Sequence, residues 1–229
     1  MALGDWTRNV LNETYHSVSL EVNTPLVGNG SVIINMGTST TAFGGVNMYY
    51  TAQQGFTKGR IRTIMRMDYR PRTYEWQRGG IVCMQSHLNP VDNNAAWYAF
   101  SWGLRKSTIS GSPGQQYWMI EKHTADQIHE VATGTEIDYE GVSVSDGDYY
   151  PVQLEWVADI PNLGGTRLTA SVGTLNSVDF STMVEVLDYI DTSSPLITTL
   201  GEGLFACQPQ NSSSGSKYTF DETSVYQLV

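Results

Sequence analysis

The stretch KGRIRTIMRMDY, residues 58–69, decides the fold class. Three apolar side chains alternate in it with three basic ones: Ile61, Met65 and Met67 against Arg60, Arg62 and Arg66. Successive side chains of a β-strand point to opposite faces, so this alternation predicts a long strand with one face in a core. We interpret the arginine face as a solvated strand face; a local basic patch is the alternative.

The rest of the chain repeats such segments and contains no convincing helix; the best candidate is short, at residues 4–15, with an ordered arm as the alternative. Apolar runs cut by Gly, Pro, Asn and Asp are typical of a sandwich or barrel. Asp146-Gly147 predicts a hairpin, because a type I′ turn requires positive φ at both central positions. We expect an N-terminal arm over residues 1–17 and a single domain over residues 18–229. Its expected strands are 18–22, 31–36, 47–51, 58–69, 80–85, 97–104, 117–122, 128–131, 136–144, 150–157, 167–172, 183–189, 202–206 and 218–228.

Composition and charge narrow the classes of function. Only 16% of the residues are charged, and 22 are glycine, which is typical of a turn-rich β protein. The chain has 13 basic and 23 acidic residues and a net charge of −10, so we expect no nucleic-acid partner. The N-terminus has neither a basic start nor an apolar run, so we expect no secretory signal and no membrane-spanning segment.

The two cysteines, Cys83 and Cys207, lie in similar apolar strings. Their spacing fits neither a zinc site nor a thiol redox pair. We interpret them as buried thiols on two core strands, with a disulfide as the alternative.

Four segments occur in an order typical of one superfamily. They are Lys58–Met65; Gly79–Met84 with Trp97–Trp102; Asp148–Leu154; and Gly201–Phe205 with Phe220–Tyr226. In this order they resemble the concanavalin A-like lectin/glucanase superfamily, which includes laminin G-type domains. The likeness spans residues 58–229 and implies an all-β, antiparallel jelly-roll sandwich of two curved sheets. It also implies ligands on the concave face or its rim loops, although the fold carries many functions.

Aromatic residues suggest a carbohydrate site. Alternation sends Tyr98, Phe100 and Trp102 to the core and Trp97 to the opposite face. Sugars stack on exposed aromatic rings, while amides and carboxylates bind their hydroxyls. The predicted carbohydrate-binding residues are Trp97, Trp118, Tyr149, Asn93, Asn94 and Asp92. The alternative is that the aromatic residues pack in the core or at its rim.

A cluster of carboxylates suggests an enzymatic alternative. Glu136, Asp138 and Glu140 share one face of a predicted strand and resemble the catalytic strand of family 16 glycoside hydrolases. That resemblance makes Glu136 the nucleophile and Glu140 the acid/base, with Asp138 adjusting the pKa values of both. However, residues four apart on a flat strand are separated by roughly 13 Å, whereas a retaining pair needs carboxyl groups about 5–5.5 Å apart. We therefore expect a solvated acidic face and no catalysis.

Metal binding has weak support. Carboxylate and amide oxygens suit calcium, and related folds often carry one. Asp221 with Glu222, or Asp92 with Asn93 and Asn94, could supply such oxygens. The chain has no closed calcium-binding motif, so we expect no cofactor, with calcium as the alternative.

These observations favour a non-enzymatic binding or structural module. We expect a virion protein of the bacteriophage type, such as a capsid decoration, capsid-protrusion or tail-associated subunit. Its partners would be proteins of the assembly, with glycans and self-association as further expectations. The alternatives are a glycoside hydrolase using Glu136 and Glu140, and a secreted lectin-like module whose signal was removed.

Overall fold

The predicted alternating strand is β5 (Lys58–Asp68), which lies at the centre of one of two antiparallel sheets. In the computed structural model, Ile61, Met65 and Met67 are buried between the sheets, and the three arginines of β5 are half-buried on the opposite face. The prediction from residues 58–69 is therefore confirmed. The structure describes residues 6–11, 16–21, 26–27, 30–37, 44–50, 56–68, 78–85, 96–105, 115–124, 127–136, 147–158, 164–193, 197, 201–208 and 216–229.

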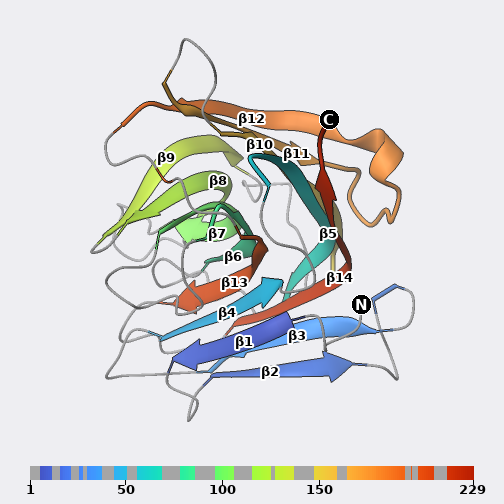
Figure 1. Cartoon of the computed structure of the whole chain (residues 1–229). Helices are drawn as coiled ribbons and strands as arrows, with labels where there is room; N and C mark the ends of the chain where they lie inside the picture. Colours follow the sequence, from blue (N-terminus) through green and yellow to red (C-terminus); the bar gives the residue numbers. More distant parts are fainter. Residues whose placement is uncertain are drawn as a thin grey trace.

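Two seven-stranded sheets form the two layers of a sandwich (Figure 1). Sheet A has the order β1 (Trp6–Leu11), β4 (Gly44–Tyr50), β13 (Gly203–Gln208), β6 (Arg78–Cys83), β7 (Trp97–Arg105), β8 (Gln115–Thr124), β9 (Gln127–Glu136). Sheet B has the order β12 (Val184–Asp191), β11 (Thr166–Val172), β10 (Tyr149–Val157), β5, β14 (Ser216–Gln227), β3 (Ser31–Met36), β2 (His16–Glu21).

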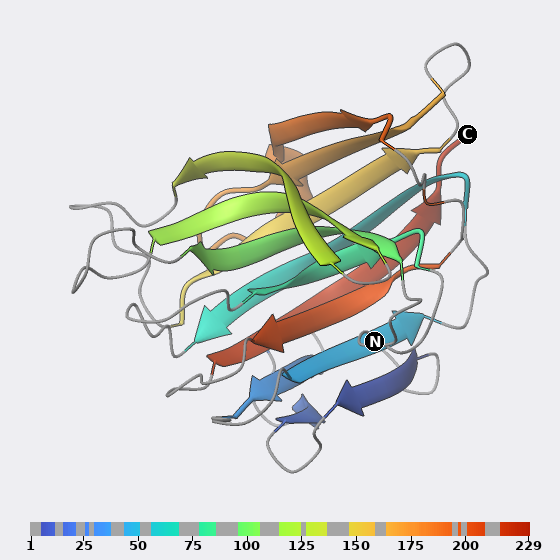
Figure 2. The same cartoon turned by 90° about the vertical axis from the view of Figure 1, so that its left-hand side faces the viewer.

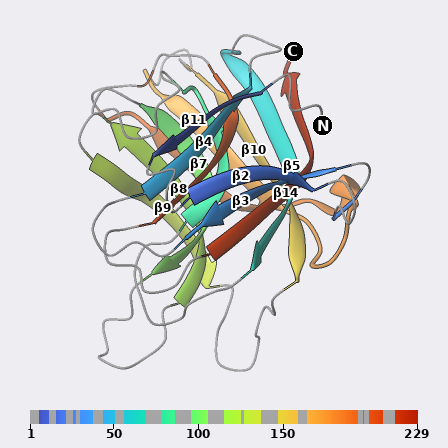
Figure 3. The same cartoon turned by 90° about the horizontal axis from the view of Figure 1, so that it is seen from below.

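The order of strands mixes local and distant pairings. Strands β6 to β9 follow one another in sheet A, and in Figure 2 the green strands of this run arch in front of sheet B. In contrast, β13 lies between β4 and β6, and β14 lies between β5 and β3. Seen from below, β3 lies beside both β2 and β14 (Figure 3). An all-β, antiparallel jelly-roll sandwich, as predicted, is the observed fold class.

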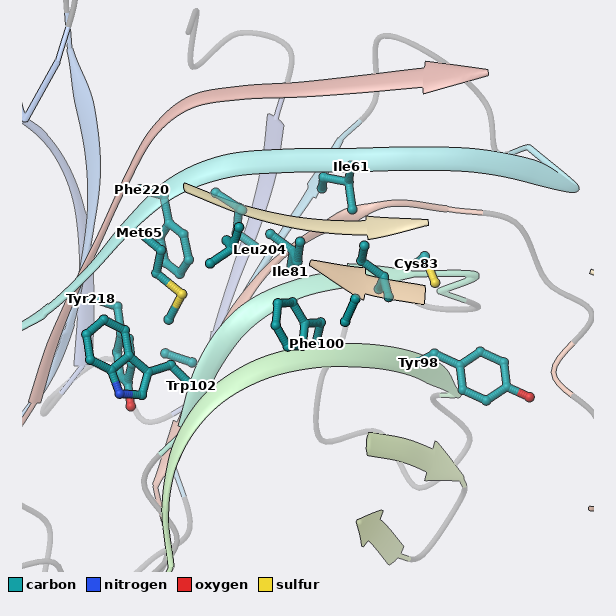
Figure 4. Packing of buried hydrophobic residues seen from close by; sticks show 14 of the residues in the cluster. Ile61, Met65, Ile81, Cys83, Tyr98, Phe100, Trp102, Leu204, Tyr218 and Phe220 are labelled. Carbon is teal, nitrogen blue, oxygen red and sulfur yellow. The ribbon is translucent and has the colours of Figure 1, made fainter. Parts of the chain in front are cut away.

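The core lies between the sheets. Its side chains come from alternate positions of the facing strands, as close-packed layers require. Figure 4 shows members from both sheets: Ile81, Phe100, Trp102 and Leu204 of sheet A with Ile61, Met65, Tyr218 and Phe220 of sheet B. Cys83 belongs to this core, and both Cys83 and Cys207 are buried free thiols, as predicted.

The described part of the N-terminal segment does not form a helix, for which residues 4–15 are the best but unconvincing candidate. Trp6–Leu11 is the strand β1, which pairs with β4 along its whole length. Trp6 is buried, and its ring centroid lies 4.9 Å from that of Tyr50. Tertiary pairing therefore determines the conformation of a segment whose own sequence gives a weak signal. The division of the chain into an arm and a single domain stays a prediction.

Two further differences concern helices and the strand β9. The sequence predicts separate strands at 128–131 and 136–144, whereas β9 is continuous from Gln127 to Glu136, with register shifts against β8. The described residues contain no α-helix; η2 (Phe180–Thr182) is a short 3₁₀ helix. None of them forms a helix that is long and apolar enough to cross a membrane.

Two glycines are required for different reasons. Gly147 has a φ of +97°, which suits a turn, and its N–H donates to Asp68 Oδ1 at 2.9 Å; however, among the described strands β10 pairs with β5 and β11 and not with β9, so the predicted hairpin between them does not form. Gly80 is required by close packing in the sheet. A Cβ at this position would lie 2.0 Å from the carbonyl oxygen of Phe100 on the neighbouring strand.

Replacement of Gly80 by alanine should therefore lower the free energy of unfolding by about 2–3 kcal/mol, because the neighbouring backbone must move. Urea denaturation measures this change. The matched control is Gly164→Asn: Gly164 is exposed with φ +58°, a Cβ there meets nothing within 4 Å, and asparagine tolerates this conformation. Equal stabilities of the Gly80 variant and the parent would contradict the packing argument.

Candidate functional site

The outer face of sheet A, which points away from sheet B, carries a second apolar cluster. Alternation places Tyr98 in the core and its neighbour Trp97 on this outer face, as predicted. The outer-face cluster consists of buried side chains from three adjacent strands: Val82, Trp97, Ala99, Phe205 and Cys207. Sheet A therefore buries side chains on both of its faces at this place.

A polar network adjoins the outer-face cluster and centres on Glu121 of β8. Arg78 of β6 forms an ion pair with the Glu121 carboxylate. The hydroxyl of Ser101 on β7 donates to Glu121 Oε2 at 3.0 Å. His123 Nε2 lies 3.9 Å from the same oxygen, so this contact is an ion pair only if the imidazole is protonated. All four side chains are buried, which makes their mutual pairing necessary.

Aromatic contacts join the polar network to the outer-face cluster. The ring of His123 stacks on that of Trp97, with centroids 4.3 Å apart and an interplanar angle of 26°. Phe205 approaches His123 edge-on at 6.0 Å. Trp97 is 2% exposed, and its Nε1 has no hydrogen-bond partner within the described part of the chain. A buried donor without an acceptor costs about 1–3 kcal/mol, so an acceptor here would be favourable.

Within the described residues, the charged pair of this network is Arg78 with Glu121. Arg78 and Glu121 neutralise each other, and the arginine also occupies the carboxylate that an acid/base reaction would need. Among the described residues, the arrangement therefore brings together buried aromatic rings, an indole N–H and an imidazole, with one carboxylate that is already paired. Such groups suit hydrogen bonding and stacking against an uncharged, hydroxyl-bearing ligand.

The predicted carbohydrate-binding aromatic residues do not share one surface. The prediction that they form a single site is therefore wrong. Trp118 pairs directly with Trp102 across β7 and β8, so it points into the core, where it also contacts Phe100 and Tyr150. Tyr149 lies on β10 of sheet B and is half-buried. Only Trp97 lies on the outer face of sheet A. The predicted loop residues Asp92, Asn93 and Asn94 lie outside the described residues.

The predicted catalytic carboxylates remain a prediction. Glu136 is the last residue of β9, and its backbone pairs with Tyr117. Its side chain, together with Asp138 and Glu140, lies outside the described residues. The structure therefore leaves their convergence open.

The predicted metal ligands have another role. Asp221 Oδ2 accepts hydrogen bonds from the Val27 N–H at 2.6 Å and the Ser31 hydroxyl at 2.7 Å. Asp221 Oδ1 accepts from the N–H of Glu222, whose own side chain is exposed and whose φ is +49°. Asp221 thus stabilises a turn next to a β-bulge in β14. Among the residues described, no three His, Cys, Asp or Glu side chains are grouped to hold a metal ion.

The arginines of β5 are paired rather than collected into a basic site. Arg60 forms an ion pair with Glu155 at 2.7 Å, and Arg66 forms one with Asp68 at 3.0 Å. The guanidinium of Arg62 lies over the rings of Phe180 and Tyr226, at 4.5 and 4.9 Å from their centroids. Their charges are therefore committed to neighbours on sheet B and, for Arg62, also to Phe180 of η2.

Sequence reasoning missed Arg78, Ser101, Glu121 and His123. The register in which β7 pairs with β8 would have revealed them, because it places Trp97 opposite His123 and Ala99 opposite Glu121. Once Trp97 is assigned to the outer face, this register places both β8 residues on the same face. The sequence alone does not provide the register.

Solved structures share this architecture at low sequence identity. An alginate lyase, Aly36B, matches with a TM-score of 0.54 and 12% identity, covering 97% of this chain and 87% of its own. The carbohydrate recognition domain of Emp47p matches with 0.52 and 9%, covering 98% and 89%. A lectin from Bauhinia forficata in complex with GalNAc matches with 0.53 and 8%, covering 99% and 94%. No family model and no curated protein sequence matches the chain.

The fold is that of the concanavalin A-like lectins. Identities of 8–12% show this shared fold and leave the activity open, because both lectins and enzymes use it.

Within this concanavalin A-like sandwich, Glu202 is a second buried carboxyl group. It directly precedes β13, and its Oε1 accepts the N–H of Phe56 at 3.2 Å. Among the described residues, its Oε2 has no hydrogen-bond partner. Burial raises the pKa of Glu202 to about 7, although the hydrogen bond from Phe56 lowers it in part. No motif in the sequence predicts a role for Glu202.

The raised pKa of Glu202 makes stability depend on pH. The unfolded carboxyl ionises near 4.5, whereas the folded one stays protonated until about 7. Its contribution is therefore fully present below pH 4.5 and is lost as the pH rises through 7. Between these values the parent should lose about 3 kcal/mol of unfolding free energy that Glu202→Gln does not lose. Urea denaturation across this range measures the difference.

A matched control for Glu202 is Glu185→Gln, since Glu185 is exposed on β12. This variant should keep the pH dependence of the parent. If Glu202→Gln also kept it, the carboxyl of Glu202 would not be the group that titrates.

Proposed function

We propose that this protein is a non-enzymatic carbohydrate-binding module whose ligand binds on the outer face of sheet A. The unpaired indole N–H of Trp97 carries this proposal. It is buried among aromatic and polar side chains, beside the stacked imidazole of His123. A sugar hydroxyl that reached this point would accept the hydrogen bond that the described residues leave open.

The comparisons support a carbohydrate ligand at the level of the fold. The Emp47p domain is a carbohydrate recognition domain, and the Bauhinia lectin was solved with GalNAc. A third similar structure, the lumenal domain of VIP36, was solved with Ca²⁺ and Man3GlcNAc (TM-score 0.52, 8% identity). These are properties of those proteins, and they make a glycan the first ligand class to test here.

The absence of catalysis is part of the proposal. Hydrolysis of a glycosidic bond commonly uses two carboxyl groups. On the outer face, the described side chains supply one, Glu121, and Arg78, Ser101 and His123 surround it. A carboxylate committed in this way is a poor nucleophile or base.

We also propose that the module serves in a virion, as a decoration, capsid-protrusion or tail-associated subunit that contacts other proteins of the particle. The support comes from the sequence: a net charge of −10 keeps a repeated surface protein soluble. Mass measurement in solution tests this role, because virion protrusions are symmetric oligomers and a monomer would contradict it.

The carbohydrate proposal predicts that substitutions at two aromatic residues have different effects on glycan affinity. Trp97→Phe removes the indole N–H and retains an aromatic ring, so affinity for a glycan identified on an array should fall about tenfold, the value of one hydrogen bond to a buried group. Tyr149→Phe, on sheet B, should leave affinity unchanged. Titration calorimetry measures both, with melting temperatures as the check on folding. Binding to no glycan by the parent, with or without calcium, would contradict the proposal.

The enzymatic alternative predicts sugar release. We expect the parent to release no reducing sugar from glycans that it binds, so Glu136→Gln should change neither binding nor release. Release by the parent that disappears in Glu136→Gln would replace the binding proposal with a hydrolase that uses Glu136 and Glu140. An assay of reducing ends over several days gives the required sensitivity.

A further inference from the structure

A buried ion pair joins the two sheets at one end of the sandwich. Lys122 lies on β8 of sheet A, and Asp191 is the last residue of β12 in sheet B. Lys122 Nζ is 2.6 Å from Asp191 Oδ2, and the two side chains are 4% and 0% exposed. Isolating such a pair from water is costly, so its full set of contacts matters.

The two oxygens of Asp191 have different partners. Oδ2 contacts Lys122 Nζ and accepts a hydrogen bond from the hydroxyl of Tyr98. Oδ1 accepts from the N–H of Ser193 at 2.9 Å and from its hydroxyl at 2.5 Å. Figure 4 shows Tyr98 at the margin of the core, with its hydroxyl directed away from the other labelled side chains.

Lys122 is also held in place from a second side. Its Nζ donates to the carbonyl oxygen of Ser193 at 2.9 Å and lies 3.0 Å from the Ser193 hydroxyl. The amine nitrogen is therefore fixed beside the carboxyl group by three contacts. This arrangement places a potential nucleophile, an electrophilic carbon and donors to both carboxyl oxygens in one dry site.

We propose that Lys122 and Asp191 condense to an intramolecular amide bond that links β8 to β12. One ammonium proton passes to Asp191 Oδ2 along the 2.6 Å contact, which leaves a neutral amine. The nitrogen lone pair attacks Cγ, and Oδ1 takes the negative charge between the two Ser193 donors. A second proton from the nitrogen reaches Oδ2, the Cγ–Oδ2 bond breaks, and Oδ2 leaves as water. The atoms balance without an oxidant or co-reactant.

The protonation state of Asp191 makes the first proton transfer uphill, so the condensation is slow and depends on how the two groups are positioned. Burial raises the pKa of the Asp191 carboxyl, but hydrogen bonds from Lys122, Ser193 and Tyr98 outweigh it and bring the pKa below its ordinary value. Asp191 therefore starts as a carboxylate, so its protonation by Lys122 is the first step. Burial, and then the contact with Asp191, raises the pKa of Tyr98, whose hydroxyl remains a donor to Oδ2.

Position lowers the barrier that a free amine and a free acid face in water. Well-oriented groups within one molecule react with effective concentrations of about 10⁵–10⁸ M. The released water also leaves a site that excludes solvent. Lys217 and Asp68 form the comparison within the same protein: they are 3.1 Å apart, but the lysine side chain is 25% exposed. That pair is open to hydration, and we expect it to stay unreacted.

Mass spectrometry of the intact, denatured protein tests the proposal directly. The purified parent should be lighter than its sequence by one water, about 18 Da. Proteolysis should release a branched peptide that contains Lys122 joined to Asp191. A parent mass equal to that of the sequence, after prolonged incubation of the folded protein, would overturn the inference and leave an ordinary ion pair.

Variants separate the amide from other losses of water. Lys122→Arg keeps a positive charge but lacks the amine, so it should show the full mass; Lys217→Arg is the matched control and should retain the loss. Loss of water that persisted in Lys122→Arg would indicate succinimide formation elsewhere and would sink the proposal. Tyr98→Phe should slow the condensation, which a time course of intact masses after refolding measures.

Discussion

Strand alternation between two facing sheets is the constraint on which the rest of this structure depends. In β5 it directs Ile61 and Met65 into the core and leaves the arginines on the opposite face. In β7 it separates Tyr98 from Trp97, so that adjacent residues belong to different environments. Every functional feature of sheet A follows from this division, because each strand contributes to the core and to the outer face at once.

The outer face of sheet A shows what this division allows. Its apolar cluster and the Arg78–Glu121 network are buried, although they lie on the side away from sheet B. Burying a charged pair is costly and adds little to stability compared with apolar packing. Arg78, Glu121 and His123 lie there beside the indole N–H of Trp97, which has no acceptor within the described part of the chain and is the group on which the proposed glycan contact rests.

The same two strands also carry the contacts that join the sheets. Tyr98 and Lys122 lie one residue away from Trp97 and from both Glu121 and His123, and they face the opposite way. Their contacts with Asp191 attach the end of β12 to sheet A. The residues of the proposed glycan site are thus supported from behind by an ion pair, and a covalent bond at that pair would make the support permanent.

The sequence by itself determined the class of fold, most strands and the burial of both thiols. It also determined which alternate residues of β5 and β7 face the core. These properties depend on local alternation and composition, which are visible within a single segment. Only the tertiary structure decided that residues 6–11 form a strand, that Trp118 belongs to the core, and that Arg78 meets Glu121 and Lys122 meets Asp191. The physical reason is register: these contacts join strands that are distant in the chain, and a shift of one residue would turn each side chain to the other face.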